Sequence, residues 1–227
     1  MARADRWGAV PKVATFGIAI RACFGKPAFE IMQQGRTPLR AQNEAFPEKT
    51  MIFGLFGKKN NNQAIVDRQY QALTSAARMP EFYERLNVPD TVMGRFEMLS
   101  AVMILFFRRT RTSGTSGQEI AQEIVDAFFQ DIDYSIRELG IGDNTVPKRM
   151  KKLAGMFYGR LEAYSKAMDA GDAEALAVAL GRNIHPKETD PVDMRALADW
   201  MFSAERHLSA QSEDTIATGS ATLPAVA

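Results

Sequence analysis

Apolar side chains recur every three or four residues along most of this chain. The spacing is clearest between Asp126 and Asn183, where two such segments are separated by Gly140 and Gly142. It is the period of an α-helix that buries one face, and no segment alternates apolar and polar residues for long enough to indicate a β-strand. The sequence therefore predicts an all-α fold, a single helical bundle-like domain of about six to seven helices.

Capping and breaking residues divide the predicted domain, residues 63–210, into successive helices. Residues that favour a helix start are Asp90 or Thr91, Thr145, Asp172 and Asp190, and residues that favour a helix end are Pro80, Gly140 and Gly171. The longest apolar run, Ala101–Phe107, is too short to span a bilayer and predicts a buried core helix. From Ser209 onward the small and polar residues predict a frayed end, so residues 211–227 are expected to be a disordered tail.

The first part of the chain differs in charge from the rest. Residues 1–50 hold 8 Lys and Arg against 4 Asp and Glu, whereas the remainder holds 20 against 23. Two interpretations stay open for these residues: a transit peptide, or upstream sequence ahead of a start at Met51, and we favour the second. Either way they are expected to be a disordered extension. Residues 51–62 (MIFGLFGKKNNN) predict a short amphipathic or flexible start, which raises the hypothesis of contact with an anionic membrane surface.

Sites for catalysis, nucleotides and metals are not predicted. The segment Gly54–Lys59 lacks the glycine spacing and the Ser or Thr of a phosphate-binding loop. The two histidines, His185 and His207, belong to no metal-binding motif, and neither position is suited to a haem ligand. Cys23 is the single cysteine, which excludes an internal disulfide. The near-neutral body argues against general affinity for nucleic acid, so no DNA partner is expected. No cofactor is expected either.

A basic and aromatic segment is the strongest candidate for a contact surface. Lys148 and Lys152 share one face of a predicted helix, with Arg149 and Lys151 beside them. This cluster is interpreted either as a solvated face or as a surface for RNA, acidic lipid or an acidic partner segment. In the next turns, Phe157 and Tyr158 cannot both face one core, so one is expected inside and the other partly exposed. Gly159 lowers helix propensity, which suggests the close approach of another backbone, either within the bundle or from a ligand.

These residues resemble the ubiquinol–cytochrome c chaperone family, the assembly factors for cytochrome b of respiratory complex III. The resemblance covers about residues 65–205. Its motifs are Asp131-x-Asp133, Arg137-Glu138-Leu139-Gly140-x-Gly142-Asp143, the basic turn Pro147–Lys152, Phe157-Tyr158-Gly159-Arg160 with Tyr164, and Ala179-Leu180-x-Arg182-Asn183. A chain that begins near Met51 is similar in form to the α-proteobacterial members.

The resemblance implies a non-enzymatic, all-helical chaperone that binds newly made cytochrome b. It also implies the ribosome and a small partner subunit as partners. The expected location is the cytoplasm, with peripheral contact at the inner membrane as a hypothesis, or the mitochondrion in a eukaryote. The alternative is a helical ribosome- or RNA-binding adaptor that acts through residues 148–152. The predicted partner-binding residues are Arg137, Lys148, Arg149, Lys151, Lys152, Phe157, Tyr158, Arg160 and Tyr164.

Overall fold

The computed structural model describes the backbone of residues 53–138 and 145–226, and side chains from residue 62 onward. Its elements are α3 (Phe53–Ala77), α4 (Pro80–Arg85), α5 (Val92–Thr110), α6 (Thr115–Glu138), α7 (Val146–Asp169), α8 (Ala173–Ile184), α9 (Arg195–Ser209) and α10 (Glu213–Ala217). No strand occurs in these two ranges, and the predicted all-α fold is confirmed. The extension at residues 1–50 and the predicted helix end at Gly140 lie outside the described residues.

Helix α5 forms the centre of the molecule. It contacts α3, α6, α7, α8 and α9, and its residues from Ala101 to Phe107 are all buried. The prediction of a core helix for this apolar run is therefore confirmed. Because neighbours cover α5 on every side, its apolar residues do not form a narrow stripe.

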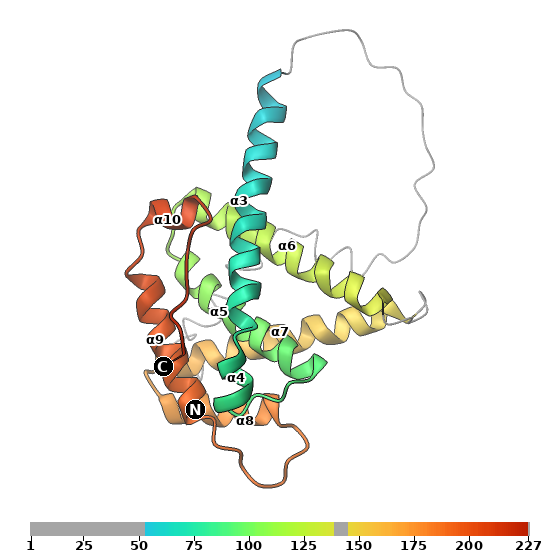
Figure 1. Ribbon diagram of the computed structural model, residues 1–227, viewed down its shortest axis with the longest axis vertical. Coiled ribbons are helices and arrows are strands. Elements are labelled where there is room, and N and C mark those ends of the chain that lie inside the picture. Colours follow the sequence, from blue (N-terminus) through green and yellow to red (C-terminus); the bar gives the residue numbers. More distant parts are fainter. Residues whose placement is uncertain (1–52, 139–144, 227) are drawn as a thin grey trace, which may run out of the picture.

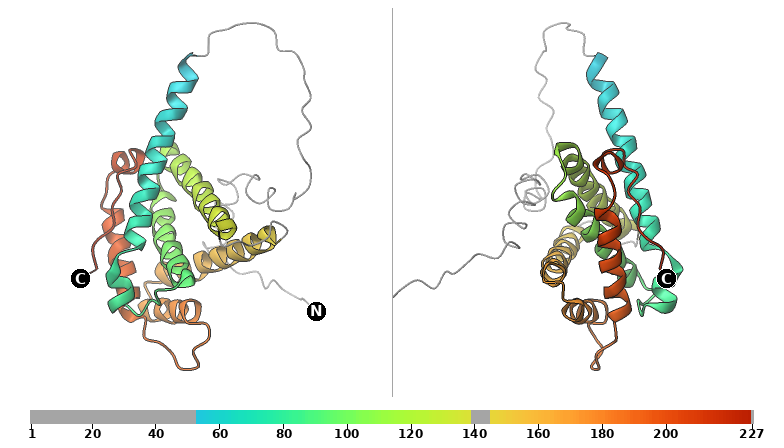
Figure 2. Two further views of the ribbon diagram at one scale, coloured as in Figure 1. Left: turned by 45° about the vertical axis from the view of Figure 1, so that its right-hand side comes forward. Right: turned by 90° about the vertical axis from the view of Figure 1, so that its left-hand side faces the viewer.

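Helices α6 and α7 both contact α5, and together they form the part of the fold that carries the candidate site. They approach each other where α6 ends and α7 begins and diverge toward their other ends, while α3 crosses α6 and contacts it (Figure 1). The first turns of α3 project beyond the other helices, as both views in Figure 2 show. The predicted flexible start is thus helical in its backbone from Phe53 onward.

Side-chain capping hydrogen bonds mark the starts of α5 and α8. The Thr91 hydroxyl accepts the Gly94 N–H at 3.0 Å, and the Asp172 carboxylate accepts the Ala175 N–H at 2.9 Å. Thr145 stands at the N-cap position of α7 but makes no capping hydrogen bond with its side chain.

The predicted start of the last helix of the domain at Asp190 is wrong. Helix α9 begins at Arg195, whose N–H donates to the Asp193 carboxylate at 2.8 Å, while the side chain of Met194 is buried. The effective start signal is therefore an aspartate three residues further along the chain.

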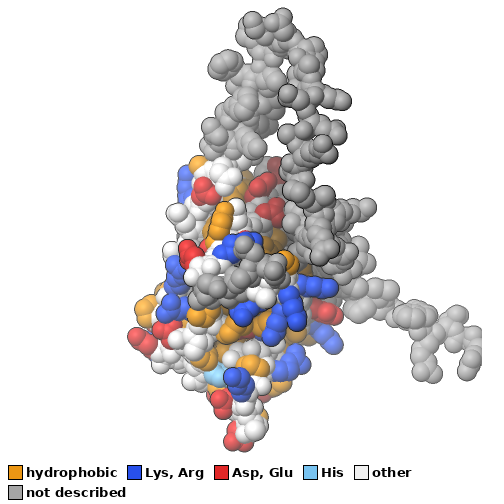
Figure 3. Space-filling model, turned by 90° about the vertical axis from the view of Figure 1, so that its right-hand side faces the viewer, with side chains coloured by type: hydrophobic (Ala, Val, Ile, Leu, Met, Phe, Trp, Pro, Cys, Tyr) orange, Lys and Arg blue, Asp and Glu red, His pale blue; other side chains and the backbone are white. Residues whose placement is uncertain are grey.

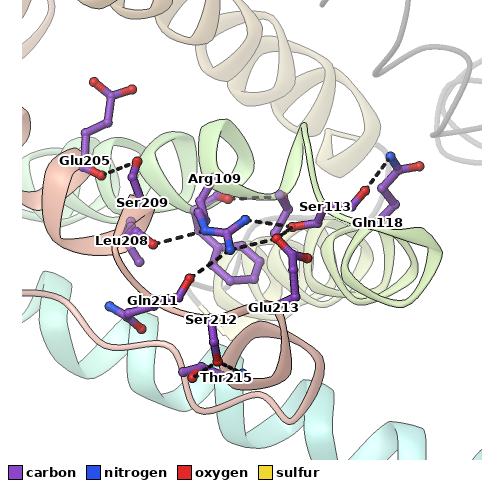
Figure 4. A network of polar contacts seen from close by, with 12 residues as sticks. Arg109, Ser113, Gln118, Glu205, Leu208, Ser209, Gln211, Ser212, Glu213 and Thr215 are labelled. Carbon is purple, nitrogen blue, oxygen red and sulfur yellow. Dashed lines mark hydrogen bonds and ion pairs between the residues drawn. The ribbon is translucent and has the colours of Figure 1, made fainter.

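The predicted disordered tail is also corrected by the structure. Residues after Ser209 continue into α10, which buries Ile216, and then run back along α3 and α9 to Val226. The Arg109 guanidinium donates to the carbonyl oxygens of Leu208 and Gln211, both at 3.0 Å, and pairs with Glu213 at 2.8 Å (Figure 4).

A buried amide holds the end of the same segment. Gln69 donates to the Ala221 carbonyl oxygen at 3.0 Å and accepts the Ala221 N–H at 2.9 Å. The small, polar composition misled the prediction because the partners of this segment are distant in sequence. We name residues 210–226 the C-terminal strap.

Candidate functional site: the outer face of helix α7

Helix α7 has one buried side and one open side. Its buried side packs on α5, α6 and α8, and it includes Phe157, Leu161, Tyr164 and Met168. These residues recur every three or four positions, as an amphipathic helix requires. The open side carries the exposed residues Lys148, Arg149, Lys151, Lys152, Gly155, Tyr158, Gly159, Glu162 and Lys166, which we call the outer face of α7.

The first two turns of α7 carry a group of positive charges. Lys148, Arg149, Lys151 and Lys152 are all exposed, and none forms a salt bridge within the described part of the chain. Figure 3 shows Lys and Arg side chains gathered around the end where α6 and α7 meet, with hydrophobic side chains between them. The positive end of the helix dipole lies at this same terminus and adds to the potential. The arrangement is suited to binding anions.

Arg137, in the last turn of α6, lies at the same end of the helix pair. Its guanidinium pairs with the carboxylate of Asp133 at 2.7 Å, one helical turn earlier. The pair is exposed to solvent, which weakens its contribution to stability. Arg137 is therefore at the surface, as a contact residue must be, but Asp133 partly neutralises its charge.

The adjacent aromatic residues of α7 separate as predicted. Phe157 is buried among the rings of Phe107, Phe128 and Phe129, whereas Tyr158 keeps 38% of its surface exposed. The ring centroids of Tyr158 and Phe129 are 6.4 Å apart, so the exposed ring still leans on α6. Tyr158 is thus placed to contact a partner, and Phe157 is a core residue.

Arg160 lies in the interior, in contrast to its predicted place on a contact surface. Its guanidinium donates two hydrogen bonds to the carboxylate of Glu97, which is also buried, and a third to the Met156 carbonyl oxygen at 2.8 Å. The guanidinium also lies 6.0 Å from the ring centroid of Phe96. Burial raises the pKa of the Glu97 carboxyl, and the Arg160 guanidinium opposes that rise.

Tyr164 is likewise an interior residue. Its side chain is 1% exposed, and its hydroxyl accepts a hydrogen bond from the Asn183 amide at 3.3 Å. Burial raises the pKa of the phenol well above its usual range. Arg160, Tyr164 and Phe157 are therefore interior residues of this chain, and they position α7 against its neighbours. The helical period predicted their side of the helix but not how far α5 and α8 cover it.

Of the two neighbours suggested for Gly159, the structure excludes a closely packed backbone from the described part of the bundle. A Cβ atom added at Gly159 would meet no described atom within 4 Å, and the same is true of Gly155. These two glycines are one turn apart on the outer face of α7, next to Tyr158. They leave the helix backbone open at this point, which permits the close approach of a second helix.

Sequence reasoning missed the buried polar residues that fix α7 in place. Besides Glu97, Arg108 of α5 pairs with Asp169 of α7 at 2.9 Å and with Glu205 of α9 at 2.6 Å. A usable signal was present, because Glu97 and Arg108 are charged residues within a strongly apolar helix.

The described residues offer no arrangement typical of a metal or haem site. No three His, Cys, Asp or Glu side chains gather to hold a metal ion in this part of the chain. His185 Nε2 lies 2.7 Å from the Asn87 carbonyl oxygen, and His207 Nε2 lies 3.3 Å from the Thr222 hydroxyl. None of the helices described is both long and apolar enough to cross a bilayer.

Comparison with known proteins gives a consistent result. The model of the ubiquinol-cytochrome C chaperone family matches residues 84–223. The ubiquinol-cytochrome-c reductase complex assembly factor 1 of Xenopus laevis is 25% identical over 154 residues, which cover 67% of this chain and 76% of that protein. The proteins of the same name from Mus musculus and Homo sapiens are also 25% identical, and the match spans about half of their lengths, 52% and 51%.

A solved structure agrees with these matches. The crystal structure of the Cbp3 homolog from Brucella abortus is similar with a TM-score of 0.71 and 46% sequence identity. The match covers 78% of this chain and 98% of that one, so it extends well beyond the α6–α7 pair.

Proposed function

This chain belongs to the ubiquinol–cytochrome c chaperone family, and on that premise we propose that it assists assembly of the ubiquinol–cytochrome c reductase complex by holding cytochrome b while that subunit is newly made. The matched residues, 84–223, contain the whole of α7. The proposed activity is binding without catalysis. The residue types on the outer face of α7 support this, since basic, glycine and tyrosine side chains suit contact with another chain.

The observation that carries the proposal is the open glycine pair beside Tyr158. Gly155 and Gly159 each reduce helix stability relative to alanine, yet no described neighbour fills the space that they leave. Small residues four positions apart allow two helix backbones to approach closely, as in the contacts between membrane-spanning helices. A client that consists of apolar helices could therefore pack on this face before it finds its partners in the complex.

The surrounding side chains suit a reversible contact. Tyr158 offers an aromatic ring with a polar end, which is typical of residues that anchor interfaces. The lysines and arginine of the first two turns keep the face soluble when no client is present. A single helix face buries a modest area, so a client would be released when a larger interface in the complex replaces it.

The decisive experiment removes the gene from the organism that carries it and restores it in variant forms. Loss of the gene is expected to abolish the assembled reductase and cytochrome b while the cytochrome b messenger persists. Re-expression of the natural chain should restore both, and Gly159→Leu should restore neither, because the added side chain blocks close approach.

The matched control is Ser203→Leu, which adds the same side chain at an exposed position of α9. It should behave like the natural chain. Normal levels of the reductase without the gene would refute the assembly function. Full rescue by Gly159→Leu would refute the proposed contact face alone.

A further inference from the structure

The charges on α7 are distributed unevenly along its length. Between Val146 and Leu161 the helix contains five basic residues and no acidic one. One of the five, Arg160, is buried with Glu97 and is unavailable to a partner. The remaining four lie in the first two turns, exposed to solvent at the end where α6 and α7 meet. We call Lys148, Arg149, Lys151 and Lys152 the basic end of α7.

The basic end differs from the other charged parts of the described surface. Among the exposed arginines elsewhere, Arg95 lies beside Asp90 at 2.8 Å and Arg195 beside Asp199 at 3.0 Å, while others, such as Arg78 and Arg206, form no salt bridge among the described residues. In the basic end, by contrast, the nearest residues along the helix are also basic or apolar. Like charges one turn apart repel each other and destabilise an isolated helix. An external anion relieves that repulsion.

The charge of the rest of the chain limits which class of anion suits the basic end. Residues 51–227 hold 20 Lys and Arg against 23 Asp and Glu. Without the four cations of the basic end, 16 basic residues remain against 23 acidic ones, so the rest of this range is acidic. A long flexible polyanion such as RNA gains affinity by following an extended basic surface, whereas the four cations here fall within a five-residue stretch of α7. A flat anionic surface touches one end of the molecule and leaves the acidic remainder in solvent.

We propose that the basic end of α7 docks on the anionic headgroups of a lipid bilayer. Each Lys or Arg close to such a surface increases binding about fivefold, and the effect falls off within a Debye length, about 8 Å at physiological salt. Four cations therefore give reversible, salt-sensitive attachment. In this orientation the first turn of α7 faces the bilayer, and Gly155, Gly159 and Tyr158 lie one to three turns above it. The inference goes beyond client binding, because lipid attachment requires no client.

The test measures cosedimentation of the purified full chain with vesicles of phosphatidylcholine that contain either no anionic lipid or about 30% phosphatidylserine. The natural chain is expected to bind the anionic vesicles preferentially and to be released by high salt. Lys148→Gln with Lys152→Gln should lower the partition coefficient roughly 25-fold, from the loss of two cations. The paired control Lys187→Gln with Arg206→Gln removes two exposed cations elsewhere and should bind as the natural chain does.

Residues 1–50 are unchanged in every variant, so their basic side chains contribute equally throughout. Three results would overturn the proposal. They are equal binding to both kinds of vesicle, unchanged binding of the Lys148 and Lys152 variant, or release of the protein from the vesicles by single-stranded RNA at a nucleotide concentration below that of the anionic lipid. None of these results depends on cytochrome b. A failure here therefore leaves the proposed assembly function untouched.

Discussion

The carboxylate of Glu97 on α5 accepts two hydrogen bonds from the guanidinium of Arg160 on α7, and both side chains are almost fully buried. The two residues are 63 positions apart in the sequence. Their contact fixes the rotation of α7 about its axis, because Phe157 and Tyr164 can enter the core only when Arg160 faces α5. The buried pair thus determines which residues of α7 remain on its outer face.

Replacement of Arg160 by methionine should strongly destabilise the fold. The buried Glu97 carboxylate would lose its cation, and such losses cost about 3–5 kcal/mol. Urea unfolding followed by circular dichroism measures the change. The double replacement Glu97→Met with Arg160→Met should recover much of it, since no buried charge remains. Arg95→Gln is the control at an exposed pair and should change stability little. A similar loss of stability in Arg160→Met and in Arg95→Gln would contradict the role of burial.

The same pair predicts a pH dependence that a purely steric role would not produce. In the Arg160→Met variant, burial holds the pKa of Glu97 above its ordinary value of 4.5 without an opposing cation. A folded state that binds its proton more tightly than the unfolded state gains stability as pH falls. The difference in unfolding free energy between Arg160→Met and the double variant Glu97→Gln with Arg160→Met should therefore decrease as the pH falls through the pKa of Glu97 in the folded state toward 4.5. A gap that stays constant in urea titrations across this range would exclude an ionised Glu97.

Gly219 should tolerate substitution poorly because of both its backbone and its surroundings. Its φ is +66°, and an added Cβ would lie 2.4 Å from the Ile65 carbonyl oxygen. Gly219→Ala is expected to destabilise the chain by about 2–3 kcal/mol, the combined effect of the left-handed backbone and the clash. Gly171→Ala is the matched control, with a φ of +68° but no described atom within 4 Å, and should cost about 1 kcal/mol. Equal losses in thermal unfolding would show that contact with α3 is unimportant.

Gln69 should determine whether the C-terminal strap stays docked. Gln69→Leu leaves the buried N–H and C=O of Ala221 without their partners, at a cost of about 1–3 kcal/mol for each unsatisfied group. Faster amide hydrogen exchange is expected in residues 219–226, while α5 keeps its protection. Gln71→Leu, at an exposed position of the same helix, provides the comparison. Unchanged exchange in the strap would show that contacts other than those of Gln69, such as the burial of Ile216 and the hydrogen bonds of Arg109, are sufficient to hold it.

The glycine pair on α7 predicts opposite effects on stability and function. Gly155→Ala with Gly159→Ala should stabilise the isolated protein by up to about 1 kcal/mol for each site, since alanine favours the helix and meets no described neighbour. Urea unfolding would measure this gain. If the pair receives a client helix, the more stable variant should also assemble less reductase in cells. A loss of stability would instead reveal that the bundle itself needs these glycines.

Several features of the fold were predictable from local patterns. The core helix at Ala101–Phe107 followed from an apolar run ended by arginines, and the cap at Asp172 followed from residue type, as did the choice between Asp90 and Thr91, which the structure decides for Thr91. The division between Phe157 and Tyr158 followed from the helical period. These features depend on residues within a few positions of one another, which is why the pattern was sufficient.

The sequence by itself determined an all-α chain, because helical periodicity and capping are local properties that do not depend on the neighbours of a helix. Only the tertiary structure decided that Arg160 and Tyr164 lie inside and that residues 210–226 form an ordered strap. Those outcomes depend on contacts such as Gln69 with Ala221, 152 positions apart. Periodicity states which side of a helix faces inward, but the width of the buried side is set by the helices that pack on it. The basic end of α7 remains open because none of the described helices covers it.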